Sequence, residues 1–219
     1  MLRYRLTLGL ATALAAGALA GCLNTPGPSI FITGNVSPDD MCLYKTSNPL
    51  VLRAVFDVDR PDKSYLFVPK YSNQMLHRES TGPFRADPNG FQVHGAEITL
   101  VDQSGATIGF PGLPNPFTVM AGDYVPPGTT TGPGEAIGAI DAIPQAYGDV
   151  MRAVVGDNGT ISAEVQVFGE TNGGYSVDGI TYQLPINLCA GCLRICLSAL
   201  AMGETGSSCP NGTYVDTGC

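Results

Sequence analysis

Alternating apolar and polar residues predict the clearest strand of this chain. In Thr160 to Phe168, apolar side chains at every second position are separated by polar ones. The apolar set is Ile161, Ala163, Val165 and Val167. A period of two turns one face of a strand toward a core and the other toward solvent.

Further segments rich in branched and aromatic residues also predict strands, because turn residues bound them. They are 50–58, 65–71, 91–101, 117–120 and 180–188. Pro69 favours an edge or a bulge in the second of these, since proline cannot donate to a ladder. Residues 169–179 are expected to form a hairpin loop with Gly173 and Gly174 at its tip.

The period changes between Pro144 and Val155. Ala146, Tyr147, Val150, Met151 and Val154 recur at helical spacing. Pro144 suits a first helical turn and Gly156 suits the stop, so one short helix is predicted at about 144–155. Several short strands with one helix predict an all-β fold, an immunoglobulin-like β-sandwich.

Residues 109–134 hold six Gly and six Pro. Such a long irregular segment is unusual in a compact domain. One interpretation is a crossover between two sheets, broken by the short strand near Phe117. The other is a binding loop, because loops on rigid scaffolds often carry function.

The N-terminus has the three-part form of an export signal. Arg3 and Arg5 precede an uncharged apolar run, 6–20, that is shorter than a membrane span. The run ends in Leu19-Ala20-Gly21-Cys22, which resembles the lipobox of bacterial lipoprotein precursors.

That resemblance implies removal of a 1–21 signal peptide and lipidation of Cys22, which would carry a thioether-linked diacylglycerol and an acyl chain. Several acyl chains make a firm anchor. Leu23 resembles the residue found there in lipoproteins sorted to the outer membrane of Gram-negative cells. The alternative is an ordinary cleaved signal, with Cys22 in a disulfide.

The mature chain divides by composition into three parts. Residues 22–38 contain three prolines and are expected to be the lipidated N-terminus and a short tether. Residues 39–188 are expected to form the sandwich, and 189–219 a Cys-rich tail. That tail is too short for a core of its own, so it is expected to depend on disulfides.

Six cysteines remain after Cys22, an even number that favours disulfides in an exported chain. They are Cys42, Cys189, Cys192, Cys196, Cys209 and Cys219. Cys42 is expected to pair with one of the tail cysteines. Two alternatives are a zinc site, since Cys189 and Cys192 have knuckle spacing, and a thioredoxin-like redox pair.

A second resemblance covers about a third of the chain. It is carried by Val165-Gln166-Val167-Phe168-Gly169, Gly173-Gly174, Leu184-Pro185-Ile186 and Cys189-Ala190-Gly191-Cys192. These segments resemble surface lipoproteins of Gram-negative soil bacteria that end in an alternating strand, a hairpin and a CxGC tail. The resemblance implies no activity.

Catalytic motifs are scarce. His77 and His94 are the two histidines, and neither lies in a zinc-protease motif or beside a nucleophile elbow. Asp57, Asp59 and Asp62 are a weak candidate for calcium, because 57 and 59 share one strand face. An ordinary solvated strand end is the favoured interpretation, so neither a metal nor a cofactor is expected.

Charge excludes one class of partner. Eleven basic against nineteen acidic residues give a net charge of −8, which opposes binding to nucleic acid. The expected function is therefore a non-enzymatic, lipid-anchored envelope protein, periplasmic or surface-facing, that binds a protein or glycan partner. Alternatives are a structural subunit of an outer-membrane assembly and an enzyme with an unrecognised site.

Overall fold

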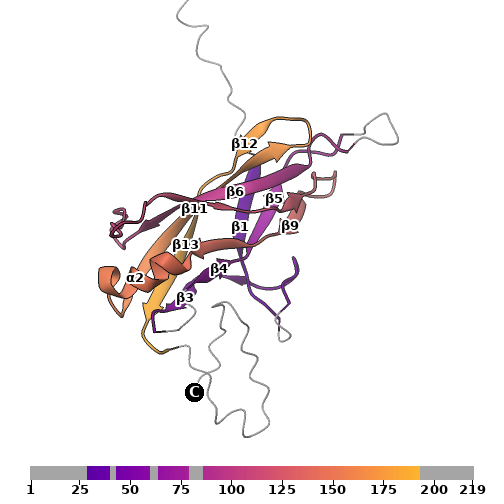
Figure 1. Cartoon of the computed structure of the whole chain (residues 1–219). Helices are drawn as coiled ribbons and strands as arrows, with labels where there is room; N and C mark the ends of the chain where they lie inside the picture. Colours follow the sequence, from indigo (N-terminus) through magenta and orange to yellow (C-terminus); the bar gives the residue numbers. More distant parts are fainter. Residues whose placement is uncertain (1–28, 40–42, 60–63, 79–85, 193–219) are drawn as a thin grey trace, which may run out of the picture.

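The computed structural model describes residues 29–39, 43–59, 64–78 and 86–192. These residues form thirteen β-strands and one α-helix (Figure 1). The strands are β1 (Ile30–Val36), β2 (Leu50–Val51), β3 (Ala54–Asp57), β4 (Tyr65–Phe67), β5 (Pro69–Asn73), β6 (Phe91–Val101), β7 (Phe117–Met120), β8 (Tyr124–Val125), β9 (Gly134–Ile137), β10 (Ile140–Ile143), β11 (Gly159–Thr171), β12 (Ser176–Asp178) and β13 (Tyr182–Cys189); the helix is α2 (Gln145–Val155).

One layer has the strand order β2-β1-β5-β9. The β4–β10 pair continues the β5–β9 ladder, because Lys70 pairs with Ile137 and Phe67 with Ile140 in the same antiparallel register. The N–H of Gly138 donates to the carbonyl of Pro69 across the interruption, at 3.1 Å. β4–β5 and β9–β10 therefore act as two long, interrupted strands.

The second layer has the order β3-β13-β11-β6-β7, with β12 added to β11 and β8 to β6. All its pairs are antiparallel except β13 with β3, which run parallel. In immunoglobulin lettering the order is A′-G-F-C-C′, and the first layer contains A-B-E. The first strand thus switches layers between β1 and β3, and the all-β sandwich predicted from the sequence is confirmed.

The core lies between the layers. The four alternating apolar residues of β11 are all fully buried, which confirms the period-two prediction. They are Ile161, Ala163, Val165 and Val167. Among the largest fully buried side chains of the opposing layer are Tyr65, Phe67 and Tyr71.

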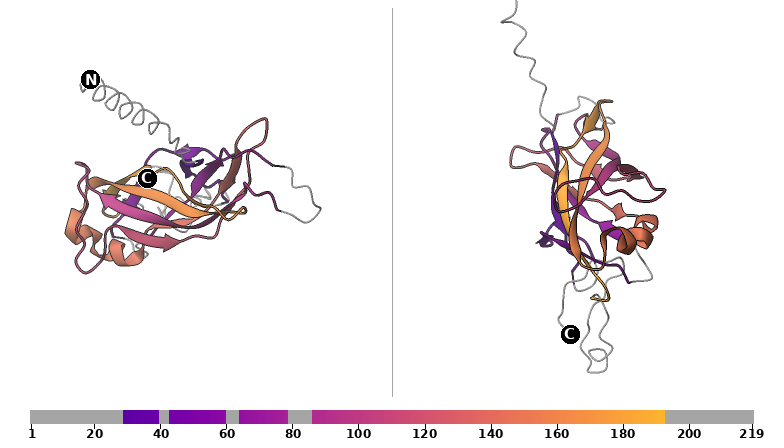
Figure 2. Two further views of the ribbon diagram at one scale, coloured as in Figure 1. Left: turned by 90° about the horizontal axis from the view of Figure 1, so that it is seen from above. Right: turned by 90° about the vertical axis from the view of Figure 1, so that its left-hand side faces the viewer.

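The predicted helix is confirmed as α2, preceded by Pro144 and followed by Gly156 at φ 99°. It leads into β11 at one end of the sandwich (Figure 2). Tyr147 stacks on Phe117 with ring centroids 4.3 Å apart, and its hydroxyl donates to the Pro114 carbonyl at 2.6 Å. The helix is thereby pinned to the C–C′ side of the second layer.

Several strand boundaries differ from the prediction. The tether expected at 22–38 is wrong for residues 30–36, because they form β1 with Ile30 and Val36 fully buried. The strand expected at 50–58 breaks where the chain changes layer. Residues 65–71 divide at Val68, and Pro69 begins β5, a position that spares the ladder.

The long Gly- and Pro-rich segment is a crossover between the layers that contains β7 and β8. Neither β8 nor the pair β9 and β10 was predicted. The hairpin expected at 169–179 is shorter, since β11 continues to Thr171 and β12 pairs back onto it. Its tip lies where predicted, with Gly174 at φ 84°.

Candidate functional site

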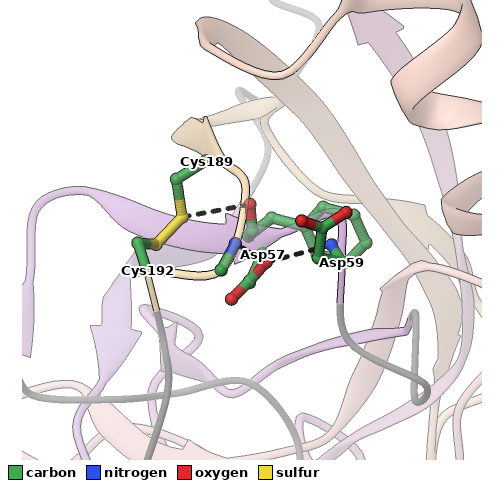
Figure 3. Close-up of a disulfide and its surroundings, with 6 residues drawn as sticks. Asp57, Asp59, Cys189 and Cys192 are labelled. Atoms are coloured by element: carbon green, nitrogen blue, oxygen red, sulfur yellow. Dashed lines mark hydrogen bonds between the residues drawn. A yellow bond between two sulfur atoms is a disulfide. The ribbon is translucent and has the colours of Figure 1, made fainter.

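Among the described residues, two places bring potentially functional side chains together, and they lie at opposite ends of the sandwich. At the first, β3 and β13 run parallel, so their carboxyl ends meet with Asp57 opposite Cys189. Cys189 and Cys192 form a disulfide just past this edge (Figure 3). The N–H of Val58 donates to the Cys189 carbonyl at 2.8 Å and closes the ladder.

Asp57 is a buried carboxylate, 3% exposed, that holds the disulfide loop. Its Oδ1 accepts the N–H of Gly191 at 2.8 Å and the N–H of Asp59 at 3.0 Å (Figure 3). Gly191 has φ 68°, a conformation that glycine adopts without steric cost. The loop between the cysteines is therefore anchored to a strand end far away in sequence.

This corner also contains the one group of three potential metal ligands among the described residues. The ligand atoms of Asp57, Cys189 and Cys192 lie within 4.8 Å of one another. In the structure the two sulfurs bond to each other. The zinc alternative rested on the two cysteines alone, and the buried carboxylate is an addition that sequence spacing did not indicate.

The two described aspartates of the calcium candidate accept hydrogen bonds from different groups. Asp59 Oδ1 accepts a hydrogen bond from Arg152 Nη1 at 2.5 Å, and Asp57 binds backbone N–H groups. Asp57 and Asp59 thus each have a structural role. The solvated strand end expected from the sequence is wrong for Asp57, whose carboxylate is buried. Asp62 lies outside the described residues.

Most of the predicted cysteine chemistry also lies outside the described residues. This applies to the lipidation site Cys22 and to four disulfide candidates. Those four are Cys42, Cys196, Cys209 and Cys219. The pairing of Cys42 with a tail cysteine stays a prediction.

The second place is a surface that we call the loop end: residues 74–78, 86–90, 121–133 and 172–175. In immunoglobulin lettering these belong to the B–C, C′–E and F–G connections. The B–C, C′–C″ and F–G loops of antibody variable domains meet at the same end and carry the antigen-binding residues. The upper end of the sandwich in Figure 1 contains these connections.

Backbone hydrogen bonds join the three connections. The N–H of Asn172 donates to the Gly90 carbonyl at 2.8 Å, and the N–H of Gly173 donates to Pro88 at 2.9 Å. The N–H of His77 donates to the Gly128 carbonyl at 2.7 Å. The loop end is consequently a preformed surface, and binding a partner would cost little conformational entropy.

Asp87 organises the middle of this surface. Its carboxylate accepts the N–H of Asn89 at 2.8 Å and the N–H of Arg78 at 3.0 Å, and it pairs with His77 Nδ1. A histidine beside a carboxylate is the geometry of an oriented base. Because Asp87 also holds two backbone N–H groups, a structural role accounts for the pair. His94 is exposed on β6.

A tyrosine–aspartate contact ties the C′–E connection to β5. The Tyr71 hydroxyl donates to Asp123 Oδ2 at 3.0 Å. Burial raises the pKa of Asp123 above its ordinary value, and the Tyr71 hydrogen bond opposes that rise. Burial also raises the pKa of Tyr71, so the hydroxyl remains a donor throughout the ordinary pH range.

Three large side chains with apolar surface are exposed at the loop end. Leu76 is 60% exposed, Tyr124 44% and Tyr175 74%. All three lie next to residues 88–90. Asn89 Nδ2 donates to the Leu76 carbonyl, and the Tyr124 ring lies against Gly90. The hairpin that contains Tyr175 donates a backbone hydrogen bond to the Pro88 carbonyl. No local sequence pattern marks these three residues, because only the tertiary structure brings the three connections together.

The sequence matches no protein-family model, and comparison with curated proteins and with solved structures finds no significant match. Within the described ranges no helix has the length and apolar character needed to cross a membrane.

Proposed function

We propose that this chain is a lipid-anchored, non-enzymatic protein of the cell envelope, held in the outer membrane through Cys22. Its immunoglobulin-like domain is an interaction module, and the loop end is its interaction surface. The observation that carries the second part is the convergence of three hydrogen-bonded connections that expose Leu76, Tyr124 and Tyr175. Exposed aromatic and aliphatic side chains on a rigid frame are typical of binding surfaces.

The anchor is tested by replacing the proposed lipid acceptor. Cys22→Ala should abolish labelling with a palmitate analogue and leave unprocessed precursor, because only a thiol accepts the diacylglyceryl group. Labelling that survives the substitution would contradict lipidation at Cys22.

The interaction surface is tested by hydroxyl-radical footprinting. The envelope-bound protein is compared with a soluble full-length mature chain carrying Cys22→Ser behind an ordinary export signal. Tyr124 and Tyr175 should be oxidised less in the envelope than in solution. Leu52 is the matched control, since it is 82% exposed and lies near the opposite end of β1. Equal oxidation of the tyrosines in both preparations would refute the loop end as the interaction surface.

A further inference from the structure

We propose that the partner of the loop end is the lipid bilayer itself, with Leu76, Tyr124 and Tyr175 seated among its headgroups. The inference rests on the proposed lipid anchor at Cys22. It adds an orientation: the loop end faces the membrane, and the Cys189–Cys192 corner faces away from it.

Two backbone hydrogen bonds show where the chain enters the domain. The carbonyl of Ser29 accepts the N–H of Gln74 at 2.9 Å, and the carbonyl of Ile30 accepts the N–H of Ile180 at 3.3 Å. Gln74 is the first residue of the B–C part of the loop end. The chain therefore enters β1 at the loop end, beside β12 at the top of Figure 1.

The linker between the proposed anchor and the domain is short. Cys22 precedes Ser29 by seven residues, which span at most about 25 Å when fully extended. Ile30 lies beside Val167, because the N–H of Gly179 donates to the Val167 carbonyl and the next N–H, that of Ile180, donates to the Ile30 carbonyl. The eight residue steps of β11 from Gly159 to Val167 cover about 27 Å, at roughly 3.4 Å per residue. An inverted domain, with the Cys189–Cys192 corner on the bilayer, would need more chain than the linker contains.

The exposed side chains of the loop end suit a membrane–water boundary. Tyrosine rings with a polar tip and an apolar body accumulate at the membrane–water boundary, and leucine adds apolar area. Backbone groups of the three connections bond to one another, among them Asn172 to Gly90 and His77 to Gly128, so contact with headgroups leaves these groups satisfied.

The loop end has no basic patch, since Arg78 is the one exposed Lys or Arg among its described residues. Asp87 is paired with His77, and Asp123 is half-buried against Tyr71. Glu170 and Asp178, on the strands that lead to the F–G tip, are exposed. Once the 1–21 signal is removed, nine basic and nineteen acidic residues give the anchored chain a net charge of −10, so anionic lipid would repel rather than attract it. A zwitterionic surface is the one this end fits.

The experiment uses the absence of tryptophan from the sequence. Full-length lipidated protein is prepared as two single-tryptophan variants, Tyr175→Trp at the loop end and Leu52→Trp at the opposite end. Each is reconstituted into phosphatidylcholine vesicles, with and without brominated acyl chains. We expect the emission of Tyr175→Trp to shift to shorter wavelength and to lose most of its intensity with brominated lipid. Leu52→Trp should keep its emission in both.

Flotation of the vesicles separates the two proposals. Protein that floats with lipid, while Cys22→Ser stays soluble, supports the anchor independently of orientation. If the protein floats but Tyr175→Trp is no more quenched than Leu52→Trp, the anchor stands and membrane docking is overturned. Quenching of both reporters alike also overturns it, as does a Tyr175 footprint that needs a membrane protein absent from the vesicles. If lipidated preparations do not float at all, both proposals fail.

Discussion

Replacing Asp57 by alanine tests whether this carboxylate holds the disulfide loop. The change removes the acceptor of two backbone N–H groups, those of Gly191 and Asp59. A hydrogen bond to a charged group contributes roughly 1.5–3 kcal/mol net. Both donors are only partly buried, so water replaces some of the loss. We expect the free energy of unfolding to fall by about 2–4 kcal/mol.

Urea denaturation followed by circular dichroism measures this loss, with an unchanged denaturant slope showing that the folded state is preserved. Asp57→Asn keeps an amide oxygen that can accept both N–H groups but removes the negative charge, so it should lose about half as much. Asp59→Ala is the control, since it removes an exposed ion pair with Arg152 and should change the midpoint little.

The same variants separate a local effect from a global one. If Asp57 holds the loop, Asp57→Ala should also speed reduction of the Cys189–Cys192 disulfide in native conditions, because Gly191 loses its partner. A free energy of unfolding for Asp57→Ala within about 0.5 kcal/mol of the wild type, the range of ordinary surface substitutions, would refute the anchoring role of Asp57.

Three further changes test the fold. Ile30→Ala should lower the free energy of unfolding, measured by urea titration, by about 2–5 kcal/mol, because Ile30 is fully buried in a strand. An unchanged free energy would favour the tether interpretation instead. Gly134→Ala should lower the melting temperature, since its Cβ would stand 1.9 Å from the Pro126 carbonyl oxygen, whereas Gly132→Ala meets nothing within 4 Å and should melt as the wild type does. The raised pKa of Asp123 means that the folded state binds this proton more tightly than the unfolded state, whose pKa is near 3.8. Its contribution to stability is complete below that value and is lost as the pH rises through the folded pKa. Melting curves of wild type and Asp123→Asn should therefore diverge over this window, the wild type losing relative stability; parallel curves would contradict it.

Local signals were sufficient for the central strands and the helix. The predicted ranges 91–101 and 117–120 coincide with β6 and β7, and Pro144 and Gly156 bracket α2. They were insufficient for β1 and β9. The first lies just after Pro26 and Pro28 in a stretch that resembles a linker, and the second, Gly134–Ile137, has a weak strand pattern. Both are strands because neighbours in the sheet complete their hydrogen bonds.

By itself the sequence determined the class of fold, the position of the helix and hairpin tip, and the expectation of an exported, lipid-anchored chain. Each of these depends on periodicity or on motifs within a few residues. Tertiary structure decided that Asp57 holds a loop 134 residues away. It also decided that the start of β1 lies at the same end of the sandwich as Leu76, Tyr124 and Tyr175. Which strand ends coincide depends on how two layers pack and which strands pair, and no local pattern encodes that choice.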